Sequence, residues 1–242
     1  MINLGQTLLL GHRGARGEAL ENTFMGFQHA QRLKARGLTG IEFDVQLSAD
    51  GHLVVFHDDD LTRMCHQQSR IDQLSMAEIQ RHRQFSHQIT DLASMAPTLA
   101  SFTYIELEIK THGRTDYAKL VRALSHNLID SPIGALPIVL TSFDVELHTR
   151  LQRNKLLRHI PRGLLIRTQD TLTTATHTAK TLGCGQLGVY YPLLSESFIR
   201  YSHRYGLPVS AWTVNDIDAV KQLIKWQTDV IITDYPSQLL LN

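Results

Sequence analysis

The sequence has little cysteine, almost no net charge and no long apolar run. Its two cysteines, Cys65 and Cys184, are far apart and belong to no CxxC or other metal-ligand spacing. A cysteine metal site is therefore disfavoured, and both side chains are predicted to be free thiols in a reducing compartment. The formal net charge of +1 gives no reason to expect a general nucleic-acid binder.

No window of the sequence reaches the length of a membrane-spanning segment. The apolar residues 8–10 lack a preceding basic region, an extended apolar region and a cleavage site, so no signal peptide is predicted and the expected location is cytoplasmic. Hydrophobic residues make up 43% of the chain and charged residues 19%. This composition is typical of a globular protein and argues against disorder.

The most informative stretch is residues 40–58. Its first part alternates apolar residues with Glu42, Asp44 and Gln46, as expected for a β-strand, whose side chains point to opposite faces in turn. Two carboxylates therefore share one face. A turn and a second apolar run follow, and they lead to His57. Taken alone, the polar face is also typical of a strand whose outer side faces water.

The same alternation recurs at residues 104–110, where Glu106, Glu108 and Lys110 share a face. Two strands that direct carboxylates to the same side bring negative charges together, which is costly unless a cation or a proton compensates them. Carboxylate oxygens suit a hard cation better than they suit zinc. The two strands together predict a site for one divalent cation, either Mg²⁺ or Ca²⁺.

Strand-like and helix-like segments alternate along the whole chain. The strand-like runs are residues 8–10, 40–46, 104–110, 137–141, 163–166, 187–190, 208–214 and 229–233. Helical spacing is found at residues 22–36, 116–127, 145–154, 172–182, 196–205 and 217–225. Eight strands with helices between them predict an α/β fold, a (β/α)8 TIM barrel with a small insertion after the second strand. An open doubly wound sheet is the competitor, but it usually has fewer strands.

One domain is predicted over residues 1–242, with the insertion at about 58–100. Within it, Ser75 and Glu78 match a capping box and predict a helix start. Residues 97–99 are predicted to form a loop, and residues 81–90 to have weak order.

The 13 histidines are numerous for a chain of this length. Most of them, such as His126, His148 and His177, occur in polar helical stretches and are predicted to lie on the surface.

The carboxyl ends of the predicted strands collect chemically reactive residues. At or just past these ends lie His12, Asp44, Lys110, Ser142, Trp212 and Asp234. Active sites of (β/α)8 barrels lie at this end of the barrel. The polar faces of the strands are therefore predicted to point into the barrel mouth.

Short motifs follow one another in order from near residue 10 to residue 236. They are HRG at 12–14, ENT at 21–23, ExD at 42–44, HD with LTR at 57–63, ExK at 108–110, SF at 142–143, WTVN at 212–215 and ITDYP at 232–236. A single motif is weak, but the ordered set resembles the glycerophosphodiester phosphodiesterase family. The resemblance implies a TIM barrel that uses a divalent cation to hydrolyse a small-molecule glycerophosphodiester to glycerol 3-phosphate and an alcohol.

The resemblance also assigns roles by position. It makes Glu42, Asp44 and Glu108 the metal ligands. It makes His12 and His57 the acid/base pair, and we favour His12 as acid and His57 as base. Whether the nucleophile is water or the substrate's own 2-hydroxyl stays open.

Basic and aromatic residues complete the implied site. Arg13 and Lys110 would hold the phosphate, and Trp212 would form a wall for the glycerol moiety, although an aromatic residue at a strand end is also typical of a core. Glu106 could be a fourth ligand or a neighbour of the ligands. Ser142 and Asp234 carry little weight.

Two other functions are compatible with the same motifs. One is a phosphodiesterase of the lysophospholipase D type, which would need an apolar groove or a membrane-facing surface near the barrel mouth. The other is a catalytically inactive barrel that binds glycerophosphate or another protein. Loss of either histidine or of one of the three carboxylates would favour that reading, and all five residues are present.

Overall fold

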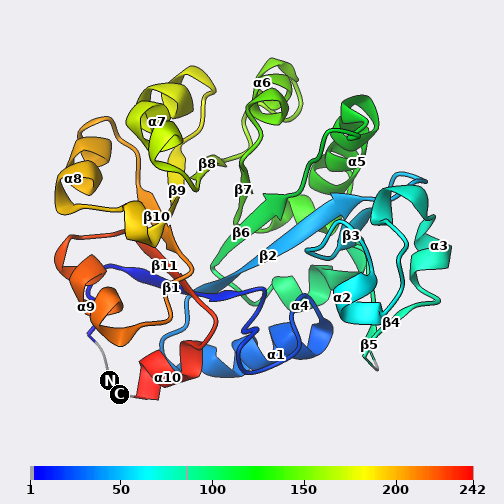
Figure 1. The fold of residues 1–242 in the computed structure, drawn as a ribbon, viewed down its shortest axis with the longest axis horizontal. Helices are drawn as coiled ribbons and strands as arrows, with labels where there is room; N and C mark the ends of the chain where they lie inside the picture. Colours follow the sequence, from blue (N-terminus) through cyan, green and yellow to red (C-terminus); the bar gives the residue numbers. More distant parts are fainter. Residues whose placement is uncertain (1–2, 86, 242) are drawn as a thin grey trace.

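Eight parallel strands close into a barrel in the computed structural model, which describes residues 3–85 and 87–241 (Figure 1). They are β1 (Leu8–His12), β2 (Gly40–Leu47), β6 (Tyr104–Ile109), β7 (Ile138–Ser142), β8 (Arg162–Ile166), β9 (Gln186–Tyr190), β10 (Val209–Trp212) and β11 (Val230–Thr233). Consecutive strands of this series pair in parallel, and β1 pairs with both β2 and β11, which closes the ring. The predicted (β/α)8 barrel is confirmed.

Helices cover the outside of the barrel (Figure 1). They are α1 (Phe24–Leu33), α5 (Tyr117–Ile129), α6 (Val145–Arg153), α7 (Gln169–Thr181), α8 (Glu196–Arg204), α9 (Ile217–Lys225) and α10 (Pro236–Leu241), with short 3-10 turns η1 (Lys34–Arg36), η4 (Pro132–Ala135) and η5 (Tyr191–Leu193). Side-chain oxygens cap the first turns of six of these helices, from Thr23, Asp116, Asp144, Thr168, Ser195 and Asp216. Within the described residues, no helix is both long and apolar enough to cross a membrane.

The register between β2 and β6 decides which carboxylates become neighbours. Glu42 lies beside Glu106, and Asp44 lies beside Glu108. Because paired positions of neighbouring parallel strands present their side chains to the same face, both strands direct their acidic residues into the barrel. The local alternation seen in the sequence thus becomes a shared acidic surface only through this pairing.

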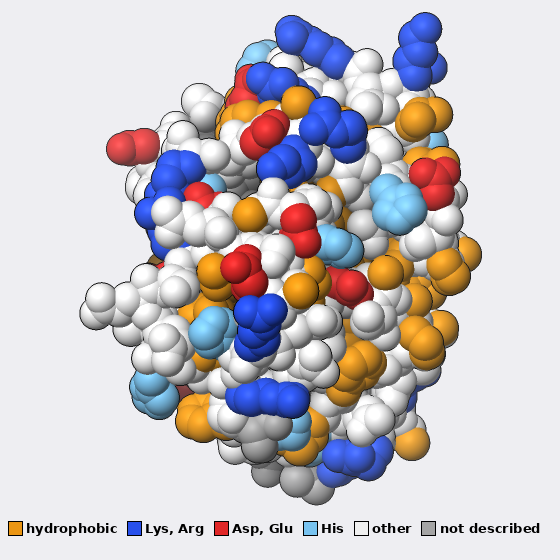
Figure 2. Space-filling view, turned by 90° about the vertical axis from the view of Figure 1, so that its right-hand side faces the viewer, with side chains coloured by type: hydrophobic (Ala, Val, Ile, Leu, Met, Phe, Trp, Pro, Cys, Tyr) orange, Lys and Arg blue, Asp and Glu red, His pale blue; other side chains and the backbone are white. Residues whose placement is uncertain are grey.

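The chain leaves the barrel after β2 and builds the predicted insertion. Strand β3 (Leu53–Val55) pairs antiparallel with β2. The further elements are α2 (Thr62–Cys65), η2 (Ile71–Gln73), α3 (Met76–Ile79), β4 (Arg83–Gln84), β5 (His87–Gln88), η3 (Ala93–Met95) and α4 (Ala96–Leu99). Eight buried apolar residues, among them Phe56, Met64 and Ile79, give it a small core. Figure 2 shows this side of the molecule, where acidic, basic and apolar side chains are interspersed.

Local predictions for the insertion are partly confirmed. Ser75 and Glu78 form the capping box at the start of α3. The loop predicted at residues 97–99 is wrong, because these residues belong to α4. Proline is tolerated in the first turn of a helix, where its missing N–H would have no partner, and Leu99 is buried. In the segment predicted to have weak order, β4 and β5 pair antiparallel, and residue 86 lies outside the described residues.

His148 does not lie on the surface, contrary to the prediction, whereas His126 and His177 are exposed. The side chain of His148 is 1% exposed. Its Nε2 is 3.1 Å from the carbonyl oxygen of Ser142, and its Nδ1 is 3.5 Å from Sγ of Cys184. Burial lowers the pKa of His148 to about 4. The polar composition of α6 concealed the fact that this histidine stands on its inward face.

Because burial keeps His148 neutral, we expect the contribution of this residue to stability to fall on mild acidification. The usual pKa is 6.5 and the folded value is about 4, so the folded state binds fewer protons than the unfolded state within this window. The stability that neutral His148 contributes is fully present above the unfolded pKa, and it is lost as the pH falls from that value towards the folded pKa. Acidification from about pH 7 to about pH 5 should cost about 2 kcal/mol of unfolding free energy at this group.

Denaturant unfolding at the two pH values measures this effect. Protonation of Glu42, Glu106 and Glu108, whose pKa values are raised, acts in the opposite direction in both proteins. On acidification the wild type should therefore lose about 2 kcal/mol more unfolding free energy than His148→Gln does. His126→Gln, on the exposed face of α5, is the control. An equal pH dependence in all three proteins would contradict the prediction.

Candidate active site

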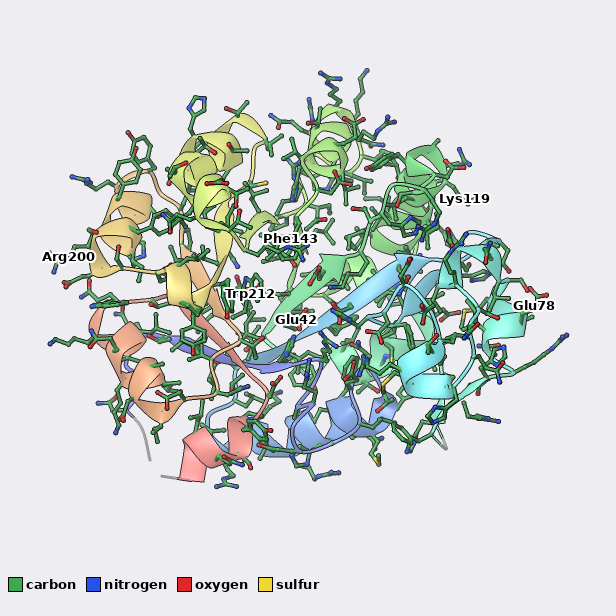
Figure 3. All side chains as sticks on the ribbon, in the orientation of Figure 1. Glu42, Glu78, Lys119, Phe143, Arg200 and Trp212 are labelled. Atoms are coloured by element: carbon green, nitrogen blue, oxygen red, sulfur yellow. The ribbon has the colours of Figure 1, made fainter. Side chains whose placement is uncertain are left out.

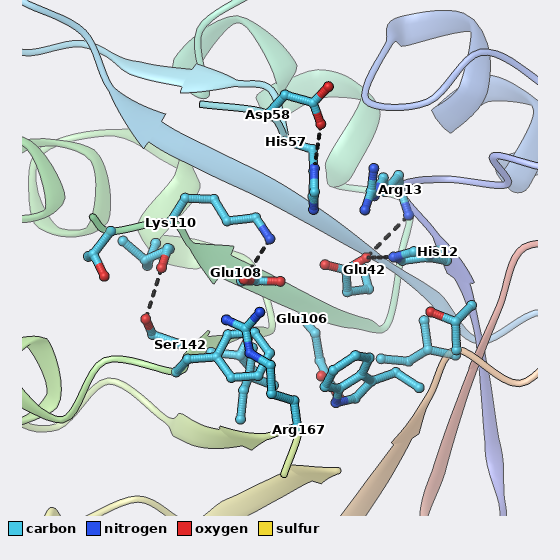
Figure 4. Close-up of a pocket in the computed structure, with 18 of the residues that line it drawn as sticks. His12, Arg13, Glu42, His57, Asp58, Glu106, Glu108, Lys110, Ser142 and Arg167 are labelled. Atoms are coloured by element: carbon cyan, nitrogen blue, oxygen red, sulfur yellow. Dashed lines mark hydrogen bonds and ion pairs between the residues drawn. The ribbon is translucent and has the colours of Figure 1, made fainter. Parts of the chain in front are cut away.

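A cavity of about 680 Å³ opens at the carboxyl ends of the strands (Figure 4). Seven of the eight predicted site residues line it: His12, Arg13, Glu42, His57, Glu108, Lys110 and Trp212. The eighth, Asp44, is 1% exposed and lies directly behind the lining, in contact with two of these residues. The barrel thus brings together side chains from β1, β2, β6 and β10 and from the segment that follows β3.

Glu42, Asp44 and Glu108 form one group of carboxylates. One oxygen of each lies within 4.8 Å of the other two. Burial, with the charges of Asp44 and Glu108, raises the pKa of Glu42 well above its usual value. Burial also raises the pKa of Glu108. A group of buried carboxyls that resists ionisation is stabilised by a cation, and three oxygen donors fit a hard divalent ion.

Two cationic groups and one amide hold Asp44 in its ionised form. Nζ of Lys110 is 3.0 Å from Oδ1, and Nε of Arg13 is 3.3 Å from Oδ2. Asn22 donates from Nδ2 to Oδ2 at 3.0 Å. Burial alone would raise the pKa of Asp44, but these partners hold it far below the usual value. Lys110 also donates to Glu108 at 2.7 Å, so one ammonium joins the carboxylates of two strands.

The loop after β1 shapes the contacts of Arg13. The backbone N–H of Arg13 donates to Oε2 of Glu42 at 3.2 Å, and its Nη1 donates to Glu21 at 2.7 Å. Gly14 follows with φ of +92°, and a Cβ there would stand 2.9 Å from the Phe27 ring. Only glycine suits that position, which explains why glycine follows the histidine and the arginine in the sequence.

An aspartate holds each histidine at Nδ1. Nδ1 of His12 is 2.6 Å from Oδ1 of Asp234, and Nδ1 of His57 is 2.7 Å from Oδ1 of Asp58. Nε2 of His12 lies 3.7 Å from Glu42, and Figure 4 shows both rings directed into the cavity. Burial lowers the pKa of both histidines, although the neighbouring carboxylates oppose this effect. Each ring can therefore present Nε2 to a bound molecule.

The two aspartates are the functional contacts that the sequence alone did not reveal. Asp234 follows β11 directly, inside the ITDYP motif, and Asp58 follows His57. The sequence placed Asp234 at the end of a predicted strand but gave it little weight, and the position of Asp58 beside His57 is a signal that could have been read. That each one contacts a particular histidine was not readable, because Asp234 and His12 are separated by nearly the whole chain.

Glu106 stands apart from the other three carboxylates. Its Oε1 accepts a hydrogen bond from Nε2 of Gln186 at 2.7 Å. Burial raises the pKa of Glu106 to about 7. It lines the cavity, but the group of three close carboxylates among the described residues does not include it. This arrangement favours a neighbouring role over a fourth ligand.

Aromatic side chains line the opposite half of the cavity. The rings of Phe143 and Trp212 meet edge to face, with centroids 5.6 Å apart at 84°, and Tyr190 packs on Trp212 at 5.6 Å. Cζ of Arg167 lies 4.0 Å from the Phe143 ring centre. Figure 3 places Phe143 and Trp212 in the middle of the barrel with Glu42. The cavity therefore has one charged half and one aromatic half.

Together, the fold and the site define a (β/α)8-barrel enzyme with an acidic cluster, two aspartate-held histidines and two basic groups at the carboxyl ends of its strands. The chain belongs to the glycerophosphoryl diester phosphodiesterase family, whose sequence model matches residues 12–238. It is thus a phosphoric diester hydrolase by family, in agreement with the resemblance found in its motifs.

Curated relatives and solved structures agree with this assignment. The glycerophosphodiester phosphodiesterase of Caldanaerobacter subterraneus subsp. tengcongensis is 27% identical, over 97% of this chain and 97% of the relative. That of Bacillus subtilis is 24% identical, over 98% of this chain and 86% of the relative. The Oleispira antarctica phosphodiesterase, solved with its product sn-glycerol-3-phosphate, has a TM-score of 0.86 at 23% identity, covering 97% of this chain and 95% of its own. The Thermotoga maritima glycerophosphodiester phosphodiesterase has a TM-score of 0.78 at 23% identity, covering 97% of each chain.

The contacts of Arg13 predict a large stability cost when its charge is removed. In Arg13→Met, the buried carboxylates of Asp44 and Glu21 each lose a cationic partner, which should cost about 3 kcal/mol of unfolding free energy or more. Denaturant unfolding with chelator present measures this cost without help from a bound cation. The effect should be smaller when Asp44→Asn or Glu21→Gln is already in place, because each of these changes removes one of the two buried carboxylates that Arg13 neutralises.

The neighbouring Arg16→Met is the matched control. Arg16 is 38% exposed and lies 3.4 Å from Asp234, so its loss should cost less than about 1 kcal/mol. Equal costs for the two arginine variants would refute the assigned role of Arg13.

Proposed function

We propose that the protein hydrolyses glycerophosphodiesters such as glycerophosphocholine and glycerophosphoethanolamine to sn-glycerol 3-phosphate and an alcohol, with one divalent cation, Mg²⁺ or Ca²⁺. The observation that carries the proposal is the meeting of the three carboxylates with His12 and His57 at one cavity. The product bound to the Oleispira antarctica phosphodiesterase supports it. We place the activity in the cytoplasm, in keeping with the free thiols of Cys65 and Cys184.

Glu42, Asp44 and Glu108 would hold the cation. When bound, the ion supplies positive charge that draws the phosphodiester to an otherwise acidic cluster and stabilises the charge that develops on its oxygens. Arg13 and Lys110 border the cluster, and both form ion pairs with Asp44. The same guanidinium and ammonium would bind the phosphate oxygens that face away from the carboxylates. Trp212 would pack against the glycerol moiety from the aromatic half of the cavity.

The partners of the two histidines support different roles. Asp58 already forms a two-point ion pair with Arg63, so its charge is compensated. Among the described residues, Asp234 forms ion pairs with His12 and with the half-exposed Arg16 at 3.4 Å, and it accepts one hydrogen bond from the neutral amide of Asn215. The less compensated aspartate stabilises a protonated ring better, so we assign His12 as the acid that protonates the leaving oxygen and His57 as the base that accepts the proton of the nucleophile.

The apolar residues of the insertion argue for small substrates over lysophospholipids. Met64 and Ile79 are buried in the core of the insertion, and Leu74 packs against that core. Phe85, in the turn between β4 and β5, is 66% exposed, and among the described residues of the insertion it is the only large apolar side chain that is exposed. A chain-binding groove of the kind that a lysophospholipid needs would require several such side chains together.

The first prediction of this proposal concerns turnover itself. The purified protein should release glycerol 3-phosphate from glycerophosphocholine or glycerophosphoethanolamine, lose the activity with chelator and regain it with Mg²⁺ or Ca²⁺. Enzymatic detection of glycerol 3-phosphate is the measurement. Release from lysophosphatidylcholine alone would favour the lysophospholipase D alternative, and no release from any of the three would favour a binding barrel.

The second prediction separates the histidines from the ligands. His12→Ala and Glu108→Ala should both abolish turnover, but only Glu108→Ala should lose the cation, because it removes one of three oxygen donors. Thermal unfolding with increasing Mg²⁺ or Ca²⁺ reads out binding without activity, since a bound ion raises the melting temperature by mass action. The wild type and His12→Ala should shift alike. Equal metal affinity in both variants would rule out Glu108 as a ligand.

A further inference from the structure

Arg63 joins two parts of the site that the chain builds separately. It lies on the short helix α2, at the start of the insertion, and its side chain is 47% exposed. It does not line the cavity. Its guanidinium nevertheless contacts two carboxylates, those of Asp58 and Glu21, through four hydrogen bonds.

The first pair of hydrogen bonds reaches His57 through Asp58. Nε of Arg63 donates to Oδ2 of Asp58 at 2.5 Å, and Nη2 donates to Oδ1 at 2.9 Å. The same Oδ1 is the atom that lies 2.7 Å from Nδ1 of His57. A two-point contact fixes the plane of a carboxylate. The orientation of Asp58 determines which way the His57 ring faces, so Arg63 restrains the histidine without touching it.

The second pair of hydrogen bonds reaches Arg13 through Glu21. Nη2 of Arg63 donates to Oε1 of Glu21 at 2.7 Å, and Nη1 donates to Oε2 at 3.1 Å. Nη1 of Arg13 donates to the same Oε1 at 2.7 Å. Glu21 is buried, and the two arginines outweigh the effect of burial, so its pKa lies below the usual value. One ionised carboxylate therefore sits between two guanidinium groups and ties them together.

A second arginine has a similar geometry without these connections. Arg114 also bridges two carboxylates of the insertion, with Nη2 2.6 Å from Asp59 and Nε 3.0 Å from Asp72. Its side chain is 43% exposed, close to the value for Arg63. Asp59 lines the cavity, but Arg114 forms no ion pair with Asp58, Glu21 or Asp44, the carboxylates that hold His57 and Arg13. The two arginines thus differ chiefly in one respect: the carboxylates bound by Arg63 also contact His57 and Arg13, and those bound by Arg114 do not.

We propose that Arg63 is a positioning residue, which sets the orientation of His57 and Arg13 together through Asp58 and Glu21. This proposal rests on the proposed function, in which His57 accepts a proton and Arg13 binds the phosphate. It goes beyond that function in assigning the insertion a part in the reaction: α2 supplies the group that couples the turn after β3 to the loop after β1.

Steady-state kinetics with glycerophosphoethanolamine at saturating cation tests the proposal. In Arg63→Gln, kcat should fall by about tenfold to a hundredfold, the loss typical when an outer partner of a functional group is removed, while KM changes little. Arg63→Lys should show a smaller loss, because an ammonium can bind one carboxylate but lacks the fork that holds two. Arg114→Gln, which removes a matched two-carboxylate bridge, should keep the wild-type kcat.

A purely structural role for Arg63 would give a different pattern. Arg63→Gln and Arg114→Gln would then lower the melting temperature alike and leave kcat alike. That result would overturn the proposal, and so would a loss in Arg63→Gln that appears only in KM.

Double-mutant cycles identify the route of the effect. Adding Arg63→Gln to Asp58→Asn should lower kcat much less than it does in the wild type, because the contact through which it acts is already weakened. In the Glu21→Gln background, Arg63→Gln should likewise lower kcat less than it does in the wild type, because Glu21 connects Arg63 to Arg13. Full additivity in both backgrounds would contradict the proposal.

Nitrogen NMR of the histidine rings supplies a readout that needs no turnover. The wild type should show His57 with its proton on Nδ1, assigned by comparison with His57→Gln, and Arg63→Gln should show a mixture of the two ring tautomers at the same pH. Identical spectra would overturn the positioning role. A wild type that hydrolyses no glycerophosphodiester would instead refute the proposed function, and the spectra would still decide whether Arg63 orients His57.

Discussion

Three buried carboxylates placed side by side are the constraint on which the rest of this structure depends. Glu42, Asp44 and Glu108 cannot all ionise in a dry site without nearby positive charge. Lys110 and Arg13 supply part of that charge from within the chain, and both form ion pairs with Asp44. The raised pKa values of the other two carboxyls mark the part that remains uncompensated, and it faces the cavity where a cation and an anionic substrate would meet.

In the barrel, the carboxylates and the other functional side chains are carried by different parts of the chain. The strands carry the carboxylates on a rigid, paired framework, in which Asp44 and Glu108 are neighbours by register. The loops beyond the strands carry the more adaptable groups, such as His57 and Arg13. Ion pairs from outside the cavity then fix these loop residues, and Arg63 does so from the insertion. These side chains are therefore held by contacts outside the cavity, while Nε2 of His57 remains accessible from the cavity.

The division of the cavity into two halves fits the two ends of the proposed substrate. Acidic and basic groups gather at β1, β2 and β6, and the rings of Phe143 and Trp212 lie opposite them, with Arg167 over Phe143. A phosphodiester has a charged centre and weakly polar organic arms. The charged half of the cavity suits the phosphate, and the aromatic half suits one of the organic groups attached to it.

The sequence by itself determined the strands, most helices and the identity of the reactive residues, because alternation, capping and turn chemistry depend on near neighbours. Glu42 and Asp44 could be read as a pair from their spacing alone. Only the tertiary structure decided that Asp234 holds His12, that Arg63 connects Asp58 to Glu21, and that His148 is buried. These contacts join residues on separate elements, and they arise when barrel closure and packing bring those elements together, which local patterns do not encode.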